Sequence, residues 1–356
     1  MKILTLAGTR PELIRLCIIM EKLDVLVDHV FVYTNQNYDP NLSTIFFYEL
    51  GIRKPDYYFS NGINGVDEFL SKSFLEFSAI LDIENPDKVL VLGDTNSGLL
   101  AMLAAKRGIP VYHMESGNRC FNDSVPEETN RRIIDSFSKY NLPYTENSKQ
   151  NLLNEGHHKN YVFKTGNPIY EVLNSFSNDI FYSGVLEKLG VDAGKFVLVT
   201  AHRAENVNNV EPLSNIVCGI NHISENYKVI FSVHPRTKNK LEKFKIKIND
   251  NIIISEPLGF FDFVKLEQHA FCVITDSGTV PEESCLFGVP SIIIRDSTER
   301  QELVECGSAI ITGTNTSNIK EAFDATLHRN TEWMPPSDYM VENVSDIVIN
   351  ILLGKV

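Results

Sequence analysis

FCVITDSGTVPEESCLFGVPSIIIRD, residues 271–296, shows in one run how the whole chain is organised. An apolar run ends at Thr275, a Ser-Gly turn follows, and a helix is predicted to begin near Val280. A second apolar run, PSIIIRD, comes after that helix. Short apolar runs joined through a helix are typical of parallel strands buried on both faces of a sheet. The segment therefore predicts a strand–helix–strand unit of an α/β protein.

The same alternation extends through the rest of the chain. Apolar runs in the first half are KILTL, HVFVYT, KVLVLG and PVYHM, and helices are predicted after them over residues 11–23, 41–50, 97–106 and 127–138. VFKTG, residues 162–166, is predicted to be the last strand of that half. The pattern restarts at FVLVTAH and continues through KVIFSVH, NIIISEP and SAIITG.

These two series predict an α/β protein with two Rossmann-like domains that face a cleft. The first domain is placed at residues 1–168 and the second at 169–336, with the boundary at a Gly-Asn-Pro break. Residues 337–356 include apolar positions at helical spacing and are predicted to return to the first domain as a C-terminal helix. A length of 356 residues agrees with two domains of about 150 residues each.

Composition and charge exclude several kinds of protein. Hydrophobic residues make up 43% and charged residues 22%, which rules out a disordered chain, a collagen and a coiled-coil rod. The 46 Asp and Glu residues outnumber the 33 Lys and Arg residues, so the formal net charge is −13. This balance disfavours a broad basic surface, and neither nucleic acid nor a membrane is expected as a partner.

The cysteines and the N-terminus bear on where the protein works. Six cysteines lie far apart in the sequence without a CxxC pair, which disfavours a disulfide framework and a zinc ribbon. The first apolar run reaches Arg10 too soon for a signal peptide, and no stretch approaches the roughly 20 apolar residues of a membrane helix. We therefore expect a soluble, cytoplasmic protein with reduced thiols.

Unusual side chains gather where strands end, and open parallel sheets bind ligands at that edge. GTRPE, residues 8–12, places Arg10 directly after the first strand, where it could meet a phosphate. Taken alone, these five residues are better explained by an ordinary strand-to-helix turn. GDTNS places Asp94 after a buried strand, and this carboxylate either caps the next helix or serves as an acid in the site.

HMESGNRC and VPEETNRR form a densely charged region. Its members of interest are His113, Glu115, Arg119, Glu127, Glu128 and Arg131. Glu127 lies in a predicted first helical turn, where the helix dipole favours acids in any case. Glu115 follows an apolar strand and lacks that explanation, so it is the stronger candidate for chemistry.

Histidines stand beside arginines at two strand ends of the second half. TAHRAEN contains His202 and Arg203, and SVHPRTKNK contains His234 and Arg236. A lone histidine is more often structural, but two at equivalent positions indicate the wall of an anion site. A metal site is the competing interpretation. No HxH, HExxH or CxxC spacing occurs, and the arginines would repel a cation, so no metal is expected.

The turn in TDSGTVPEES has the features of a diphosphate site. Ser277 and Gly278 precede a helix N-terminus whose backbone N–H groups can bind phosphate, and Glu283 could accept ribose hydroxyls. RDSTERQE adds Arg295 and Arg300 as further donors. A capping box would explain the turn locally, so the combination of motifs is what favours a ligand site.

Taken in order, the motifs GTRPE, GDTNS, HMESGNR, PEETNR, TAHRAEN, HPRTKN, TDSGTVPEE and RDSTERQE resemble those of the non-hydrolysing UDP-N-acetylglucosamine 2-epimerases. The resemblance covers residues 4–313. It implies the two-domain fold shared with GT-B glycosyltransferases, a UDP-N-acetylhexosamine substrate, a homodimer and no cofactor. The implied chemistry is elimination and re-addition of UDP, with the C2 proton returned to the opposite face of the sugar.

The resemblance also implies roles for individual residues. The catalytic set is Asp94, Glu115, Glu127, Arg131 and His202. The set that binds UDP and substrate is Arg10, Arg15, His234, Arg236, Ser277, Gly278, Glu283, Arg295 and Arg300. Asn37 stands where relatives with an activating UDP-N-acetylglucosamine site usually have histidine, so that regulation is not expected.

One loop departs from the common family pattern. NRCF followed by VPEE is shorter than usual and is similar to the branch that forms UDP-N-acetyl-L-fucosamine from a UDP-N-acetyl-6-deoxy-L-hexosamine, for capsule or O-antigen. Three other functions remain open for this combination of motifs. A GT-B glycosyltransferase would need an acceptor, a hydrolysing relative would release free N-acetylmannosamine, and a UDP-sugar-binding regulator would have no turnover.

Overall fold

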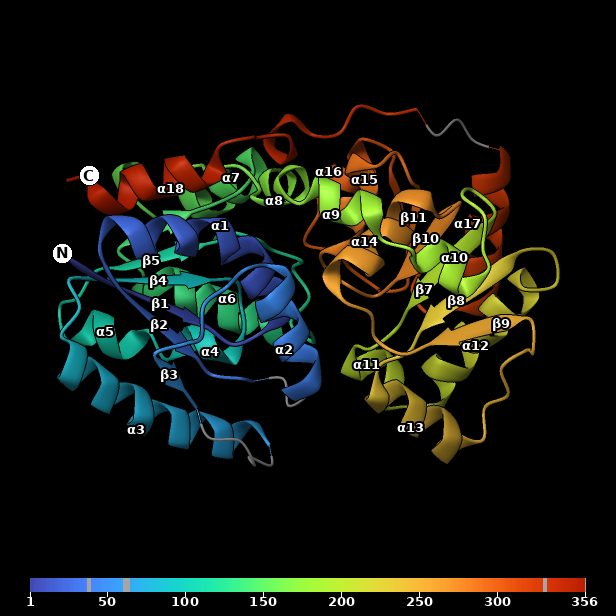
Figure 1. Ribbon diagram of the computed structural model, residues 1–356, viewed down its shortest axis with the longest axis horizontal. Coiled ribbons are helices and arrows are strands. Elements are labelled where there is room, and N and C mark those ends of the chain that lie inside the picture. Colours follow the sequence, from blue (N-terminus) through green and yellow to red (C-terminus); the bar gives the residue numbers. More distant parts are fainter. Residues whose placement is uncertain (37–39, 60–64, 329–331, 356) are drawn as a thin grey trace. The chain divides into compact units, whose positions relative to one another are not determined.

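The computed structural model describes residues 1–36, 40–59, 65–328 and 332–355. The chain divides into two units: unit 1 is Met1–Asn174 with Ser337–Val356, and unit 2 is Ser175–Pro336. Within the described residues, each unit contains a six-stranded parallel sheet with helices between successive strands (Figure 1). The predicted α/β class with two Rossmann-like sheets is confirmed.

The sheet of unit 1 has the strand order β3-β2-β1-β4-β5-β6. Its strands are β1 (Lys2–Ala7), β2 (Asp28–Tyr33), β3 (Tyr57–Tyr58), β4 (Lys88–Leu92), β5 (Val111–Met114) and β6 (Tyr140–Leu142). The order reverses between β1 and β4, where the chain crosses from one half of the sheet to the other. Doubly wound sheets bind ligands beyond the carboxyl ends of the strands at such a point.

Helices cover both faces of this sheet. They are α1 (Arg10–Leu26), α2 (Pro40–Glu49), α3 (Val66–Glu84), α4 (Asn96–Leu99), α5 (Met102–Lys106), α6 (Pro126–Phe137), α7 (Glu146–Asn154), α8 (Ile169–Ser175) and α18 (Val344–Leu353), with short 3-10 helices at Lys159–Tyr161 and Ser337–Tyr339. On one face, Phe77 of α3 and Ile134 of α6 pack in a single buried cluster with Leu4, Val30 and Val89 of the strands. Burial of these aliphatic and aromatic groups is the main force that closes the layers.

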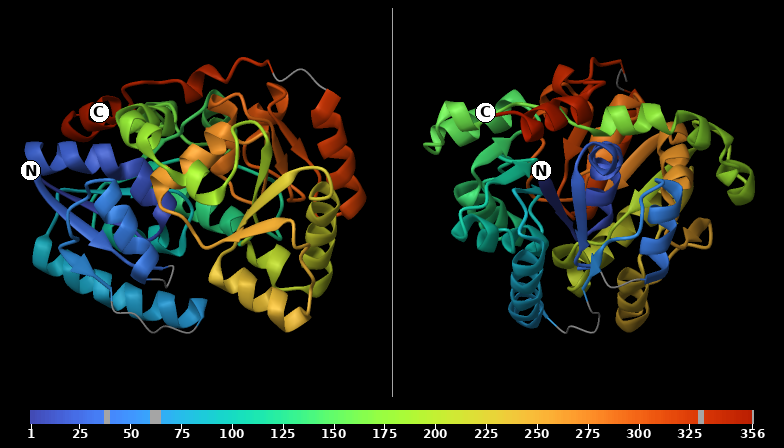
Figure 2. Two further views of the ribbon diagram at one scale, coloured as in Figure 1. Left: turned by 45° about the vertical axis from the view of Figure 1, so that its right-hand side comes forward. Right: turned by 60° about the vertical axis from the view of Figure 1, so that its left-hand side comes forward.

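The C-terminal helix α18 packs on α1 in unit 1, as predicted (Figure 2). Lys22 Nζ donates to Ser345 Oγ at 2.7 Å and to Asp346 Oδ1 at 2.5 Å. Glu171 of α8 accepts from the Ser345 backbone N–H at 2.8 Å and also from its hydroxyl. These contacts hold the end of the chain in the first unit although the residues of unit 2 intervene in the sequence.

The sheet of unit 2 has the order β12-β11-β10-β7-β8-β9. Its strands are β7 (Phe196–Thr200), β8 (Lys228–Ser232), β9 (Ile252–Ser255), β10 (Cys272–Thr275), β11 (Ser291–Ile293) and β12 (Ala309–Ile311). All neighbouring strands pair in parallel, and the order reverses between β7 and β10. The carboxyl ends of β7 and β10 therefore border the ligand-binding edge of this sheet.

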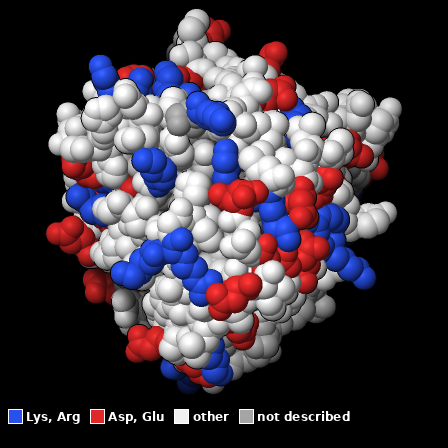
Figure 3. All heavy atoms as spheres, turned by 90° about the vertical axis from the view of Figure 1, so that its left-hand side faces the viewer, with Lys and Arg blue, Asp and Glu red and all other residues white. Residues whose placement is uncertain are grey.

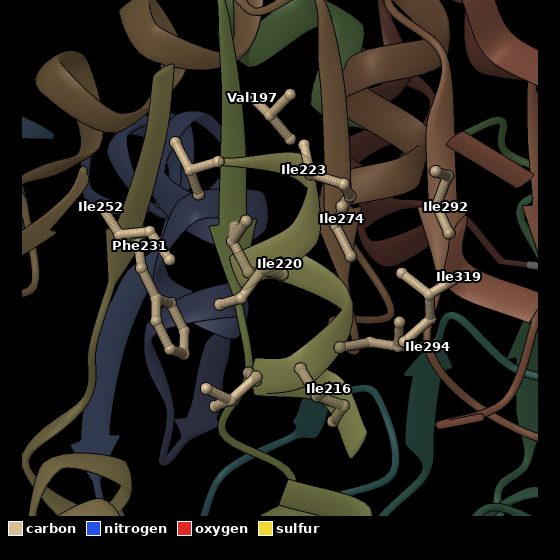
Figure 4. Packing of buried hydrophobic residues seen from close by; sticks show 14 of the residues in the cluster. Val197, Ile216, Ile220, Ile223, Phe231, Ile252, Ile274, Ile292, Ile294 and Ile319 are labelled. Carbon is tan, nitrogen blue, oxygen red and sulfur yellow. The ribbon is translucent and has the colours of Figure 1, made fainter. Parts of the chain in front are cut away.

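Branched aliphatic side chains fill the core of unit 2. The helices are α9 (Ser177–Tyr182), α10 (Val185–Leu189), α11 (Ala204–Val207), α12 (Val210–Ile223), α13 (Pro235–Phe244), α14 (Phe260–His269), α15 (Val280–Leu286), α16 (Gln301–Glu305) and α17 (Thr316–His328). Figure 4 shows Ile216 and Ile220 of α12 among Val197, Ile274 and Ile292 of the strands. The apolar runs recognised in the sequence supply much of this cluster, which explains why the strands were predictable.

Two details of the predicted elements are wrong. VFKTG is not a strand, because Val162 forms an isolated bridge to Asn141 and the sheet edge is β6. The helix predicted over residues 97–106 is two helices, α4 and α5. Between them the backbone tightens into i→i+3 hydrogen bonds, from Leu100 N to Ser97 O and from Ala101 N to Gly98 O, each 3.2 Å.

Charged side chains of both signs are interspersed on the face shown in Figure 3. Of the helices in the described residues, none has the length and apolar character needed to cross a membrane.

All six cysteines are free thiols. Cys285 and Cys306 are 21 residues apart in sequence, yet their sulfur atoms lie 3.9 Å apart. Burial raises the pKa of the Cys285 thiol to about 12.

Candidate active site

The turn between β1 and α1 is a capping box built on Glu12. Its carboxylate accepts hydrogen bonds from Thr9 N at 3.0 Å, from Gly8 N and from Thr95 Oγ1 at 2.7 Å. A Cβ at Gly8 would overlap the side chains of Ser97 and Thr34, so the close approach requires glycine. Burial raises the pKa of Glu12 to about 7, against the hydrogen bonds from Thr95 and the two backbone amides. Sequence reasoning missed this carboxylate, although its position three residues after Thr9 is the capping-box signal.

The two arginines predicted for this turn have different environments. Arg10, the first residue of α1, is partly exposed and lies over the Phe46 ring at 5.6 Å from its centroid. Arg15 is buried on the next turns of the same helix. Arg10 therefore remains at the ligand-binding edge of the sheet, whereas Arg15 lies within the packed part of unit 1.

Asp94 follows β4 and is held by α6. Arg131 Nη2 and Nε donate to Asp94 Oδ2 at 2.6 Å and 3.1 Å, and Asn130 Nδ2 donates to the Asp94 carbonyl at 3.0 Å. The Asp94 side chain keeps 27% exposure while Arg131 keeps 2%. The guanidinium therefore orients a carboxylate that is still accessible from solvent.

Glu115 lies beside the same loop, directly after β5. Its backbone is left-handed, with φ +63, which few residues other than glycine adopt. Its Oε1 accepts from Asn118 Nδ2 at 3.2 Å, and its Oε2 lies 3.5 Å from the point where a Cβ on Gly93 would stand. Asp94 and Glu115 thus follow adjacent strands, β4 and β5, at one edge of the sheet.

The first turn of α6 presents two glutamates that differ in environment. Glu127 is partly exposed on the face that carries Arg131 one turn later. Glu128 is buried and accepts from Cys120 N at 3.0 Å, Arg131 Nη1 at 3.0 Å and Arg132 Nη2 at 3.1 Å. Burial acts to raise the pKa of Glu128, but the hydrogen bonds from Cys120 and the charge of Arg131 lower it below its ordinary value. Glu128 therefore serves as an anchor for the loop and the arginines.

A second charged group lies beneath Glu115. His113 Nδ1 lies 2.8 Å from Asp135 Oδ1, and Asp135 Oδ2 accepts from Arg119 Nη2 at 2.7 Å. Arg119 also pairs with Glu155, at 2.8 Å from Nε to Oε1. Burial acts to raise the pKa of Asp135, but the hydrogen bond and charge of His113 and the charge of Arg119 lower it.

In unit 2, Asp276 organises the loop that carries His202. Its carboxylate accepts from His202 N at 3.0 Å, from Arg203 N at 2.9 Å and from Asn206 Nδ2 at 3.1 Å. Arg203 Nε in turn donates to the Asp276 carbonyl at 2.9 Å. Asp276 is fully buried and was missed from the sequence, although it stands in the quoted motif TDSG.

The remaining histidine, His234, caps helix α13. Its Nδ1 accepts from Arg236 N at 3.2 Å, which leaves Nε2 as the ring nitrogen that carries a proton in the neutral form. His234 is partly exposed and Arg236 is exposed. Both lie after β8, the strand next to β7 and hence to His202.

The predicted diphosphate turn follows β10. Ser277 Oγ accepts from Thr279 N at 3.2 Å, and Gly278 packs against Glu299, whose Oε1 would lie 2.7 Å from a Cβ at this glycine. Glu283 is buried in the helix that follows. The loop is thus shaped by an ST-type turn and by the side chain of Glu299.

Arg295 and Arg300 are buried and paired with glutamates. Arg295 Nη1 lies 3.0 Å from Glu299 Oε2, and Arg300 Nε forms an ion pair with Glu282. The structure therefore brings Ser277, Gly278, Arg295 and Arg300 into one region through Glu299 and Glu282, two carboxylates that sequence reasoning left without a role.

Within the described ranges, no group of three or more His, Cys, Asp and Glu residues is arranged to hold a metal ion. Asn37 lies outside the described residues.

Two doubly wound parallel sheets, each with charged side chains at its carboxyl end, are the architecture of the GT-B-like class, which includes enzymes that act on nucleotide sugars. The family model for UDP-N-acetylglucosamine 2-epimerase matches residues 22–353. The chain belongs to this family, and it is an isomerase of the epimerase type.

Individual relatives agree over nearly the whole chain. A Methanocaldococcus jannaschii UDP-N-acetylglucosamine 2-epimerase is 40% identical over 353 residues, 94% of this chain and 95% of its own. A Pseudomonas aeruginosa protein, UDP-2,3-diacetamido-2,3-dideoxy-D-glucuronate 2-epimerase, is 34% identical over 341 residues, 93% of this chain and 94% of its own. The crystal structure of the M. jannaschii enzyme in complex with UDP-GlcNAc and UDP has a TM-score of 0.93 at 38% identity and covers 99% of both chains.

Proposed function

We propose that this enzyme interconverts UDP-N-acetylglucosamine and UDP-N-acetylmannosamine by non-hydrolysing epimerisation at C2. The observation that carries the proposal is the pair of carboxylates, Asp94 and Glu115, on adjacent strand ends, with Arg131 bound to Asp94 at 2.6 Å. Inversion at C2 needs one group to remove a proton and another to return it, and two neighbouring carboxylates can do both.

The proposed reaction is an elimination followed by an addition. A base removes the C2 proton, the C1–O bond to UDP breaks, and the electron pair of the C–H bond forms the double bond of a 2-acetamidoglucal. UDP then adds back at C1 while a proton reaches the opposite face of C2. No atom changes its net oxidation state over the cycle, so the reaction requires no redox cofactor.

Within unit 1, we assign C2 proton transfer and leaving-group protonation to Asp94, Glu115 and Glu127. Arg131 orients Asp94 through two hydrogen bonds and shares a helix face with Glu127. Arg10, partly exposed at the end of β1, is proposed to bind phosphate, and Arg15 is proposed to support it from within α1. Positive charge near a departing diphosphate stabilises the transition state more than the ground state.

Within unit 2, we assign UDP binding to the loops after β7, β8 and β10. His202 and His234 would donate to phosphate oxygens, Ser277 would add a hydroxyl, and Glu283 would accept ribose hydroxyls. The other proposed contributors are Arg236, Gly278, Arg295 and Arg300. Asp276 supports this set because it fixes the backbone on which His202 and Arg203 stand.

The alternative substrate is UDP-N-acetyl-6-deoxy-L-talosamine, which the same chemistry would convert to UDP-N-acetyl-L-fucosamine. The observation that favours it is the short loop after Arg119. Cys120 donates through its backbone N–H and its thiol to Glu128, and Phe121 has a left-handed φ of +52 and 63% exposure. This tightly held loop can therefore discriminate between UDP-sugars that differ in their hexosamine.

Proton NMR in deuterium oxide tests the reaction and the substrate together. The purified enzyme is given each UDP-sugar separately without an acceptor, and the H2 signal is followed. Loss of H2 with formation of the C2 epimer of UDP-N-acetylglucosamine supports the main proposal, whereas reaction of the 6-deoxy sugar alone supports the alternative. Free N-acetylmannosamine as the main product would contradict the non-hydrolysing mechanism, and no reaction would favour a glycosyltransferase or a binding protein.

We further propose that the enzyme is a cytoplasmic homodimer that supplies a sugar for a surface polysaccharide. The support is the family membership together with free cysteines, which agree with a reducing compartment. Light scattering at working concentration tests the dimer, because a monomer mass would contradict it. Loss of the polysaccharide in a deletion strain, restored by the wild-type gene and not by Asp94→Asn, tests the biosynthetic role.

A further inference from the structure

His113 and Asp135 form a fully buried pair directly beneath the proposed catalytic edge. His113 belongs to β5 and precedes Glu115 by two residues, while Asp135 belongs to α6 and follows Arg131 by one turn. Their side chains lie 2.8 Å apart, from Nδ1 to Oδ1. Because both side chains are excluded from solvent, neither can touch a substrate, and a role in the reaction must act through other residues.

The geometry defines what each ring nitrogen of His113 does. Nε2 lies 2.8 Å from the Gly93 carbonyl oxygen, which can only accept, so Nε2 donates. Nδ1 faces Asp135, whose other oxygen already accepts from Gly117 N at 3.2 Å and Arg119 Nη2 at 2.7 Å. The ring therefore bridges the Gly93 carbonyl, through Nε2, and the Asp135 carboxylate, through Nδ1.

These contacts reach both catalytic loops. The Gly93 carbonyl immediately precedes Asp94, and the Gly117 amide follows Glu115 by two residues. Gly93, Glu115 and Gly117 have φ values of +76, +63 and +78, which is an uncommon backbone for any residue other than glycine. A non-glycine residue in this region persists where surrounding contacts determine the conformation.

A further contact leads from the pair to the Glu115 carboxylate. Arg119, which Asp135 holds, donates through Nη1 to the Asn118 carbonyl at 2.7 Å. Asn118 Nδ2 donates to Glu115 Oε1 at 3.2 Å. The orientation of the Glu115 side chain is therefore coupled to Asp135 through Arg119 and Asn118.

We propose that His113 and Asp135 are positioning residues that hold the Asp94 and Glu115 loops in one fixed arrangement during C2 epimerisation. The inference rests on the proposed function, because it assigns a purpose to the arrangement of those two carboxylates. It adds two residues that neither contact substrate nor exchange protons with it.

Three variants at His113 separate the two contacts. His113→Asn retains a donor near Nδ1, His113→Gln retains one near Nε2, and His113→Leu retains neither. We expect kcat to fall by about 10- to 100-fold in His113→Leu, since small misplacement of catalytic groups has effects of this size. The two amide variants should recover part of the loss. Because the proposed UDP contacts lie mainly in unit 2, KM and the Kd for UDP should stay within about threefold of wild type.

Glu171→Gln is the matched structural control, because Glu171 is also buried and hydrogen-bonded, to Ser345, in the same unit. It should lower Tm without changing kcat per folded molecule. Asp135→Asn provides a second variant at the pair, and activities are normalised to UDP-binding stoichiometry so that unfolded protein does not count. If His113→Leu folds poorly, the kcat values of His113→Gln and Asp135→Asn are compared with those of wild type and Glu171→Gln instead.

Wild-type kcat in the folded His113 and Asp135 variants would overturn the inference, as would an equal loss of kcat in Glu171→Gln. A parallel rise in KM and UDP Kd would also overturn it, because that result indicates general distortion. These results differ from failure of the proposed function, which would appear as absence of H2 exchange in the wild-type enzyme itself.

Discussion

Arg131 Nη2 lies 2.6 Å from Asp94 Oδ2, and this contact joins helix α6 to the end of β4. The same guanidinium reaches Glu128 through Nη1 at 3.0 Å, so one arginine bridges an accessible carboxylate and a buried one. Asp94 is thereby held at the end of β4, and Glu115 Oε2 lies 3.5 Å from the point where a Cβ on the preceding residue, Gly93, would stand. The proposed proton transfer at C2 depends on that placement.

Removal of any of the three proposed acid–base carboxylates should abolish most turnover. Asp94→Asn, Glu115→Gln and Glu127→Gln keep the size of each side chain but remove its proton-transfer capacity, so kcat should fall by about 100- to 10,000-fold. UDP binding, measured by calorimetry, should be retained because the proposed UDP contacts lie mainly in unit 2. A variant that keeps the wild-type rate would remove its residue from the mechanism.

Glu12 should make the stability of the enzyme fall between about pH 4.5 and 7. Its pKa is about 7 in the folded protein against an ordinary value of 4.5, so over this range the unfolded chain releases a proton that the folded chain retains. The contribution is present below pH 4.5 and is lost as the pH rises to 7. It amounts to about 3 kcal/mol in the free energy of unfolding.

Glu12→Gln is the variant that checks this pH dependence. Its carbonyl oxygen can still accept from Gly8 and Thr9, and its amide can donate to the Thr95 hydroxyl, so the turn is kept without a titrating group. Urea unfolding between pH 5 and 8 should show a smaller decline in stability for the variant than for wild type. Parallel curves would contradict the assignment.

Gly278→Ala should weaken UDP binding. The new Cβ would lie 2.7 Å from Glu299 Oε1, and Glu299 is buried between two arginines, so the loop or the glutamate must shift. We expect the Kd for UDP to rise by about 10-fold, equivalent to about 1.4 kcal/mol. Gly184→Ala is the control, since a Cβ there meets no atom within 4 Å. Equal UDP affinity in both variants would show that this turn is not at the nucleotide.

Asp276→Asn should loosen the loop that carries His202. A carboxamide has no negative charge and only one acceptor oxygen. The hydrogen bonds that Asp276 Oδ2 accepts from the amides of His202 and Arg203 and from Asn206 therefore weaken, and the contact of Oδ1 with His202 N is lost. The expected loss of stability is about 1–3 kcal/mol. Thermal unfolding measures it, and a UDP titration should show weaker binding. An unchanged Tm would indicate that the loop is held by other contacts.

Much of the fold was predictable because its strands are buried on both faces. Runs such as KVLVL in β4 and FVLVT in β7 have apolar side chains at every position or nearly so, which periodicity alone detects. β3 has two residues, and β6, with the sequence YNL, includes Asn141. Neither forms an apolar run, since each lies at an edge of its sheet and is specified by its neighbours.

The candidate site was predictable in outline from strand ends, but its internal pairing was not. Glu127 and Glu128 are adjacent, and successive helical residues point about 100° apart, so the sequence does not reveal which is buried. The burial of Glu128 goes together with its hydrogen bonds from Cys120 and Arg132, which come from other parts of the loop and helix. His113 and Asp135 meet across 22 residues, and such a contact follows from tertiary packing rather than from any local pattern.

The step that defines the proposed mechanism is the departure of UDP from C1 and its return during each epimerisation. UDP-N-acetylglucosamine labelled with heavy oxygen at the atom that bridges C1 and the β-phosphorus tests this step most directly, with the label followed by phosphorus NMR. We expect the wild-type enzyme to scramble the label into the non-bridging β-phosphate positions, since free UDP can rotate before it adds back. Epimerisation with the label retained wholly in the bridge would contradict the elimination mechanism.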